Sequence, residues 1–179
     1  GPDFYKNKGR FLSKFDLMDA NFITTSPDCV DFLKNKNNCF YIPNPSDKSI
    51  DNLRIYNNKC DNDVFFAMSH GVHRGTLKQG KTDYRDNFLK KLTKNEDINF
   101  DFYGLNNTQP IWAQEFLDTI SNSKMGLNLS RGKPIKYYSS DRIAQFMGNG
   151  LVTLIDEKTQ YQNFFNHDEM VFYKDYQDL

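Results

Sequence analysis

The chain has 179 residues, enough for one domain with a hydrophobic core, or for one domain and part of another. Its formal net charge is +0 at pH 7, so the overall charge argues against a nucleic-acid partner. The sequence has no long apolar run, which argues against a transmembrane segment. Cys29, Cys39 and Cys60 are odd in number and widely spaced, which indicates reduced thiols in a cytoplasmic protein rather than disulfides or a zinc site.

The first 48 residues predict a series of short elements. We expect a helix over 12–20, a strand over 21–25, a helix over 26–36 and a strand over 39–42. Ser26 and Pro27 are typical of an N-cap followed by the first helical position, and they place the start of the second helix. Pro43-Asn44-Pro45 predicts a rigid, non-helical connector.

From residue 49 onward, apolar strands alternate with helices of about ten residues, which predicts an α/β fold: a mostly parallel sheet with helices on both faces. Strands are expected over 63–68, 98–103, 125–129, 151–155 and 170–173, and helices over 84–92, 112–120, after 140, over 160–165 and from 175, where the last one is cut off. Ligands of such sheets bind at the carboxyl ends of the strands, which singles out the loops after Met68, Tyr103, Leu129 and Ile155.

The loop over 130–140 combines basic side chains with hydroxyl groups just before a helix. Arg131 and Lys133 lie in the loop, and Ser139, Ser140 and Asp141 lead into the helix. Free backbone N–H groups and the helix dipole make such a position suitable for an anion.

Arg142 follows in the first turn of this helix, where a cation is unfavourable unless an anion accompanies it. Arg142 and Gln145 are three residues apart and are expected to share one face. The alternative is that Ser140 or Asp141 is an ordinary N-cap and that both long side chains contact solvent. The sequence supports the two interpretations equally.

The loop after the strand over 63–68 carries groups that commonly contact phosphates or sugar hydroxyls, and it could equally be a plain surface loop. These groups are Ser69, His70, Gly71, His73 and Arg74. Two histidines with no further ligand nearby argue against a metal site. Arg85, at the start of the next helix, faces either the same crevice or solvent.

Several well-known motifs are absent from the sequence: G-x-G-x-x-G after a strand, G-x-x-x-x-G-K-[ST], G-x-S-x-G and H-E-x-x-H. Their absence argues against a dinucleotide dehydrogenase, a P-loop nucleotidase, an α/β-hydrolase and a zinc protease. Scattered carboxylates give no indication of a glycosidase pair.

The segment SSDRIAQFMGNGLVTLID, over 139–156, resembles the donor-binding signature of GT-B glycosyltransferases, a group that includes the glycosyl transferases group 1 and spore-maturation-protein-like members. Ser140, Arg142, Met147 and Gly150 match the signature, and Asp156 ends the strand as expected. The resemblance implies the Rossmann-like C-terminal half of a GT-B enzyme.

Other segments are similar to the same template and imply a division of the chain. NFITTSPDCVDFL and CFYIPNPSD resemble the end of the acceptor-side domain and its linker, which assigns residues 1–48 to that domain, with 1–2 as a tag scar. DVFFAMSHG and FDFYG resemble the first strands of the donor domain, which assigns 49–179 to nucleotide-sugar binding, with a truncated C-terminal helix.

The resemblance also implies roles for individual residues. Diphosphate binding is assigned to Ser139, Ser140, Asp141, Arg142, Arg131 and Lys133, ribose or base binding to Gln145, Tyr103 and Gly104, and further ligand contacts to Ser69, His70, Gly71, Arg74 and Arg85. Gln145 stands where the family has Glu, and Tyr137 stands where the family has an upstream acid. No metal or other cofactor is expected, because the helix dipole and side chains stabilise the leaving diphosphate.

The function implied is that of the donor-binding portion of a bacterial-like glycosyltransferase. It would transfer a sugar from a nucleotide-diphosphate donor to a glycan, lipid or protein acceptor held by the missing N-terminal domain, in the cytoplasm or at the inner membrane face. The isolated fragment is expected to be inactive. Two alternatives are a nucleotide-sugar 2-epimerase of the same fold and a degenerate domain for carbohydrate binding or assembly.

Overall fold

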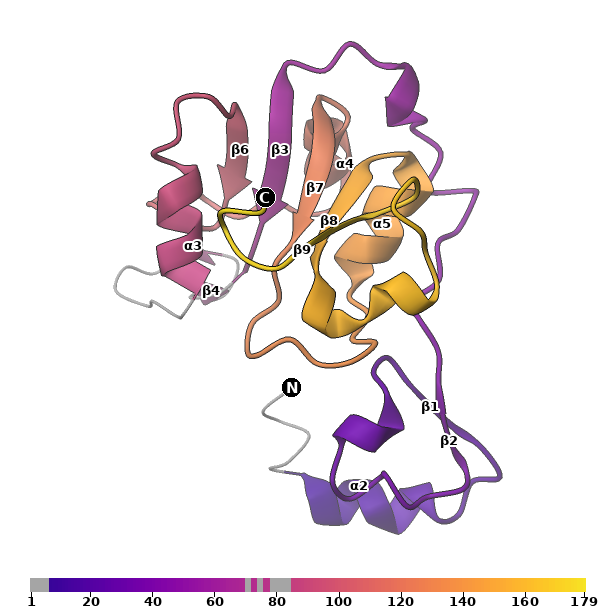
Figure 1. The fold of residues 1–179 in the computed structure, drawn as a ribbon. Coiled ribbons are helices and arrows are strands. Elements are labelled where there is room, and N and C mark those ends of the chain that lie inside the picture. Colours follow the sequence, from indigo (N-terminus) through magenta and orange to yellow (C-terminus); the bar gives the residue numbers. More distant parts are fainter. Residues whose placement is uncertain (1–6, 70–71, 74–75, 78–84) are drawn as a thin grey trace.

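The computed structural model describes residues 7–69, 72–73, 76–77 and 85–179. Within these residues, five strands form a parallel sheet in the order β6-β3-β7-β8-β9 (Figure 1). The strands are β3 (Asn62–Ala67), β6 (Phe100–Tyr103), β7 (Ser123–Asn128), β8 (Val152–Asp156) and β9 (Val171–Tyr173). The predicted α/β fold with a parallel, Rossmann-like sheet is confirmed.

The strand order reverses between β3 and β7, which are neighbours in the sheet although β6 lies between them in the sequence. The chain first moves outward from β3 to β6, then returns past β3 and continues through β7, β8 and β9 in one direction. Open α/β sheets bind ligands outside the carboxyl ends of the strands at such a reversal. The β3–β7 pair therefore marks the edge at which a site is expected.

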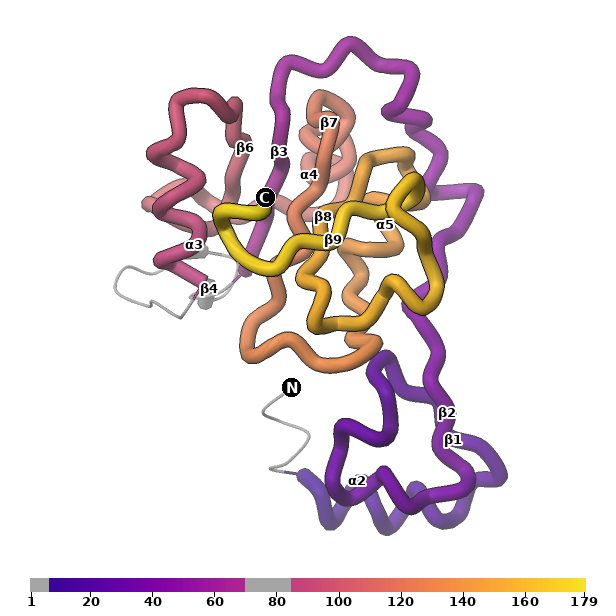
Figure 2. Tube along the Cα trace, in the orientation of Figure 1, coloured from indigo at the N-terminus to yellow at the C-terminus, as the bar shows by residue number. Residues whose placement is uncertain are grey.

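Helices cover both faces of the sheet. Successive residues of a strand point to opposite faces, so the apolar side chains of β3 need a covering layer on each face. Phe66 packs with Leu89 of α3 (Arg85–Leu92) on one face. Phe65 packs on the other face against α4 (Ala113–Ile120) and α5 (Asp141–Asn149), with its ring centroid 6.0 Å from that of Phe146. Figure 2 shows α3 and α5 on opposite sides of the strands.

Gly126 of β7 lies directly beneath the Phe146 ring of α5. A Cβ atom at this position would approach the ring Cε2 atom to 2.6 Å, closer than side-chain atoms approach one another. The glycine thus lets the aromatic ring rest against the strand backbone.

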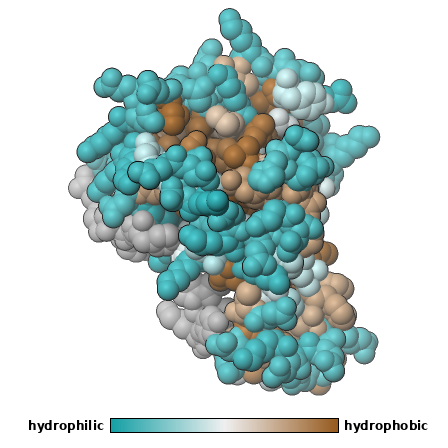
Figure 3. All heavy atoms as spheres, in the orientation of Figure 1, coloured by the Kyte–Doolittle hydropathy of each residue, from teal (hydrophilic) through white to brown (hydrophobic). Residues whose placement is uncertain are grey.

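The face that carries α3 is less completely covered than the face that carries α4 and α5. Val152 and Val171, which point to the α3 face, are 44% and 38% exposed. Figure 3 shows apolar side chains at the surface over the sheet on this side.

A smaller unit precedes the connector. In its described residues, β1 (Asn21–Ile23) pairs in parallel with β2 (Cys39–Tyr41), and α2 (Lys8–Phe15) packs beside them. A separate apolar cluster joins Phe15, Val30, Leu33 and Cys39. Figure 1 shows this unit below the main sheet, on the side of the strands' carboxyl ends.

Four predicted helices differ from the structure. The helix expected over 26–36 is wrong: η1 (Pro27–Cys29) is a single 3-10 turn, and Val30 is extended (φ −117°, ψ 104°) because Val30 and Leu33 both turn inward against Phe15. The first helix lies earlier, over Lys8–Phe15. The helix expected over 160–165 is replaced by 3-10 turns, η3 (Glu157–Thr159) and η4 (Tyr161–Asn163), and residues 174–178 form bends and turns.

The loop after β3 contains two short paired segments, β4 (Val72–His73) and β5 (Thr76–Leu77), in antiparallel register. A further 3-10 turn, η2 (Ile55–Asn57), leads into the main sheet. In the described ranges, no helix combines the length and the apolar character needed to cross a membrane.

Candidate ligand site at the carboxyl edge of the sheet

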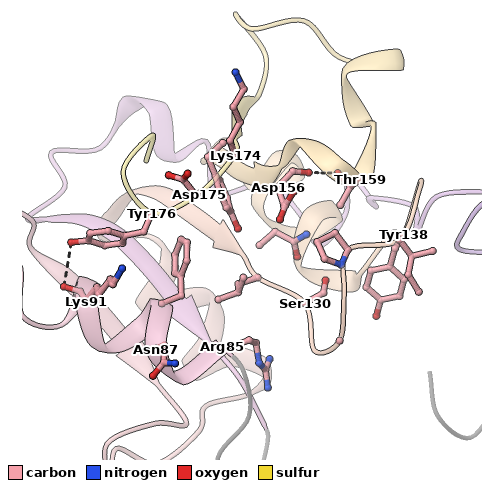
Figure 4. Close-up of a pocket in the computed structure, with 17 residues that line it drawn as sticks. Arg85, Asn87, Lys91, Ser130, Tyr138, Asp156, Thr159, Lys174, Asp175 and Tyr176 are labelled. Carbon is pink, nitrogen blue, oxygen red and sulfur yellow. Dashed lines mark hydrogen bonds between the residues drawn. The ribbon is translucent and has the colours of Figure 1, made fainter.

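A cavity of about 370 Å³ lies at the carboxyl ends of β7, β8 and β9 (Figure 4). Its walls come from α3, from the loops that follow these strands and from the C-terminal turn. They are formed by Arg85, Asn87, Phe88, Lys91, Asn128, Leu129, Ser130, Gly132, Pro134, Ile135, Tyr138, Asp156, Thr159, Tyr173, Lys174, Asp175 and Tyr176. Most of the wall surface is apolar, as in typical small-molecule sites, and charged residues of both signs also line it.

Arg142 joins the carboxyl ends of β3 and β7 beside this cavity. Its Nη1 donates to the carbonyl of Ala67 (3.0 Å), and its Nη2 donates to the carbonyl of Leu129 (3.1 Å). The guanidinium lies over the Phe66 ring, 5.3 Å from the ring centroid. Because Leu129 lines the cavity, this cation is one hydrogen bond away from a cavity-wall residue, at the point where the strand order reverses.

The direction of Arg142 differs from the sequence-based prediction. Arg142 and Phe146 are one turn apart and point together toward the sheet. Gln145 is partly buried elsewhere on α5, and its backbone carbonyl accepts a hydrogen bond from Asn149 Nδ2 (2.9 Å). The described contacts of the Arg142 side chain are thus with main-chain carbonyls and with the Phe66 ring.

Burial, together with the nearby positive charge of Arg85 as a smaller cause, lowers the pKa of Arg142 to about 10. The hydroxyls of Tyr138 and Tyr173 act on this pKa in the opposite direction. Arg142 still carries its charge at neutral pH. Arg85 is 4% exposed and lines the cavity, and Arg142 is near it, so two guanidinium groups place positive charge beside a cavity whose wall also carries lysine and aspartate side chains.

The residues at the start of α5 lie close together but bind other parts of the chain. Ser139 Oγ accepts a hydrogen bond from the backbone N–H of Asn44 (2.9 Å), and Asp141 Oδ1 accepts one from Asn44 Nδ2 (2.7 Å). Among the described contacts, the Ser140 hydroxyl donates to Asn128 Oδ1 (2.9 Å), and it accepts no capping hydrogen bond from an N–H group of α5.

The comparison with protein families agrees with this architecture. A family model described as glycosyl transferase-like matches residues 82–179, more than half of the chain. The chain belongs to the glycosyl transferase-like family. No curated protein and no solved structure matches it.

The match covers a GT-B-like C-terminal domain and supports a glycosyltransferase function in general. It includes α3, α5 and every residue that lines the cavity. The site built from the geometry therefore lies inside the part of the chain that is shared with glycosyl transferase-like proteins.

The other predicted site residues of this glycosyl transferase-like chain are more dispersed. Arg131 and Lys133 are exposed in the loop after β7, and Ser69 is exposed directly after β3. His70, Gly71 and Arg74 lie outside the described residues.

Tyr103 ends β6 and Gly104 follows it, and neither residue lines the cavity. Gly104 has a φ of 81° and packs against the backbone of Met68, so a side chain would not fit there. Tyr103 lines a separate hollow together with Asp101. Burial, with the nearby Asp101 charge as a further cause, raises the pKa of Tyr103.

Sequence reasoning missed several residues of the cavity wall. Tyr173 ends β9 and Tyr176 follows it, and the carboxyl end of this strand is not among those that the sequence singles out; Phe88 is predicted only as part of a helix core. Applying the carboxyl-end rule to the last strand would have found the first two. Within the part of the chain that the structure describes, no three His, Cys, Asp or Glu residues gather in an arrangement that could hold a metal ion.

Proposed function

We propose that this chain binds the nucleotide-diphosphate sugar donor of a glycosyltransferase, at the cavity beside Arg85 and Arg142. The observation that carries the proposal is the position of this cavity, at the carboxyl edge of the sheet and next to the strand reversal, with the two guanidinium groups beside it.

The two parts of the cavity suit the two parts of such a ligand. Planar guanidinium groups bind phosphate oxygens through charge-assisted hydrogen bonds. Phe88, Ile135 and Tyr138 offer apolar surface on which a nucleoside can pack. Arg142 uses one N–H of each terminal nitrogen for protein carbonyls, and a guanidinium has five N–H groups in total.

In the reaction that we propose, the sugar passes from the donor to a glycan, lipid or protein acceptor. Positive charge fixed near the diphosphate would stabilise it as it leaves, which removes the need for a metal ion. Residues 49–179 would form the donor domain, and residues 1–48 would belong to the acceptor-side domain and linker.

A second candidate, a non-catalytic binding or assembly domain, is favoured by the start of α5. Ser139, Ser140 and Asp141, the residues assigned to the diphosphate, bind Asn44 and Asn128 instead. Gln145 also lacks the charge of the Glu that the resemblance leads us to expect at this position.

Titration with UDP, GDP, ADP and CMP, followed by calorimetry or by NMR shift mapping, tests the proposal. We expect one nucleoside diphosphate to bind, with shifts around Arg85, Tyr138 and Leu129. Arg85→Gln should weaken binding at least about tenfold, because charge-assisted hydrogen bonds contribute roughly 1.5–3 kcal/mol.

Arg10→Gln is the matched control, since Arg10 is an exposed arginine on another helix, α2. It should leave the affinity unchanged. If none of the four nucleotides binds at millimolar concentration, the non-catalytic candidate replaces the donor-binding one.

A further inference from the structure

The loop that walls the cavity is held on its outer side by the N-terminal unit. The Ser139 N–H donates to the carbonyl of Thr24 (2.7 Å), and the Ser26 N–H donates to the carbonyl of Lys136 (3.0 Å). The Thr25 hydroxyl donates to the same Lys136 carbonyl (3.0 Å). Segments more than a hundred residues apart are thus joined by backbone hydrogen bonds.

Asn44 adds the contact closest to α5. Its backbone N–H binds Ser139 Oγ, and its side-chain amide binds Asp141 Oδ1. The flanking residues Pro43 and Pro45 have no N–H group and restrict the backbone, so the only backbone donor of this tripeptide is directed at the start of the helix.

An aromatic cluster fixes the same interface a few residues away. The Tyr41 ring packs on Tyr137 (centroids 5.3 Å apart) and stacks on Phe164 (5.6 Å, 25° between ring planes). The hydroxyls of Tyr41 and Tyr161 are 3.2 Å apart. Burial raises the pKa of Tyr41, so its hydroxyl keeps its proton for this hydrogen bond.

This interface bears on the ligand site through the loop itself. Ile135 and Tyr138 line the cavity, while Tyr137 and Ser139, on either side of Tyr138, bind the N-terminal unit. The Tyr137 N–H also donates to the Thr159 carbonyl (2.8 Å), which joins the loop to η3, the turn that follows β8. Residues that line the cavity and residues that contact the N-terminal unit are thus interspersed over 135–139, so a shift of the contacts would also shift the cavity wall.

We propose that residues 21–45 hold the cavity wall in place and that Asn44 is the positioning residue at the start of α5. The nature of the ligand rests on the proposed function, whereas the positioning of the loop does not. The N-terminal unit, which precedes the main sheet in the chain, would thereby determine the shape of the cavity that we propose for the donor.

Hydrogen exchange of the amides over 136–141 tests this proposal on the whole chain. Asn44→Ala removes the hydrogen bond to Asp141, and we expect the Ser139 amide to exchange about fivefold to tenfold faster, as for the loss of one hydrogen bond. Asn52→Ala is the matched control, because the Asn52 amide binds only the nearby Ser49 carbonyl among the described contacts (3.2 Å). Amides of β3 and β7 should keep their protection in both variants.

Asn44→Asp should have a larger effect than Asn44→Ala, since it places a carboxylate against Asp141. Combining Asn44→Asp with Asp141→Asn exchanges donor and acceptor and restores the hydrogen bond. We expect the double variant to recover most of the Ser139 protection. A general loss of stability would not be rescued in this way.

The proposal is overturned if the amides over 136–141 exchange equally fast in Asn44→Ala and Asn52→Ala, or if the double variant is no better protected than Asn44→Asp. Failure of the proposed function gives a different result. In that case the wild-type chain binds none of the four nucleotides, while the Asn44 variants still loosen the loop.

Discussion

The β3–β7 pair is joined at both of its ends, and the two joints differ in kind. At the carboxyl end, Arg142 donates to main-chain carbonyls of both strands in partly buried surroundings. At the amino end, Lys124 and Asp63 form an ion pair of 2.7 Å between side chains that are 57% and 31% exposed. Both joints use a cation, but the first is more buried than the second.

The difference shows which cation the fold depends on. An exposed ion pair is screened by solvent and contributes little to stability. A partly buried guanidinium that donates to two carbonyls contributes more, because its removal also takes a charged donor from each of those carbonyls. At the carboxyl end, therefore, the same side chain, Arg142, both stabilises the fold and lies beside the proposed ligand site.

The largest expected effect is that of Arg142→Ala. We expect the free energy of unfolding to fall by about 2–3 kcal/mol, because two hydrogen bonds from a charged donor are lost while their acceptors stay in place. Urea unfolding measures the change. Arg142→Lys should recover less than half of it, since one ammonium group cannot span both carbonyls as the fork does. Equal stability of the Lys variant and the wild type would show that charge alone, and not bridging, matters at this end.

A smaller loss is expected from Ser140→Ala, at the same end of β7. The change removes the donor to Asn128 Oδ1, and Asn128 is 3% exposed, so we expect a loss of about 1 kcal/mol in urea unfolding. Ser13→Ala is the matched control, because the Ser13 hydroxyl binds the Arg10 carbonyl in an exposed helix. If the two serine variants are equally stable, the carboxyl end is less dependent on its polar contacts than the comparison implies.

The smallest effect is expected at the amino end. The hydrogen bond from Lys124 and that from the Asn99 N–H lower the pKa of Asp63. Because the folded-state pKa is lowered, its contribution is present above the unfolded pKa and is lost as the pH falls through the folded value. Lys124→Ala should move the Asp63 pKa toward its ordinary value in an NMR titration, only in part because Asn99 remains, with little change in the urea midpoint. A loss as large as that of Ser140→Ala would remove the distinction between the two ends.

The parallel sheet could be predicted because its information is local. The apolar run of β3 and the periodic pattern of α4 are each visible in one short window of sequence. The helix over 26–36 failed for the opposite reason. Ser26 and Pro27 are good local start signals, but Val30 and Leu33 turn toward Phe15, and this tertiary contact overrides the local preference.

The site was predictable at the level of position but not of orientation. The loop after Leu129 was singled out correctly as part of the edge that contains the cavity. The partners of Arg142 were not predictable, because Ala67 lies 75 residues away and offers only its carbonyl, which has no sequence signature. Asn44 was hidden for the same reason, since its acceptors Ser139 and Asp141 lie almost a hundred residues later.

Gly126 has a consequence that reaches beyond its own surroundings. Because no side chain stands on the strand there, the Phe146 ring can touch the backbone, and α5 can lie close to the sheet. Arg142 is one turn before Phe146 and must reach across the sheet edge to Ala67 and Leu129. We expect a methyl group at position 126 to push Phe146 and α5 away from the sheet. The Arg142 guanidinium would then lose its hydrogen bonds to the two carbonyls. The position of the Arg142 charge at the carboxyl edge of the sheet therefore depends on the absence of a Cβ atom at Gly126.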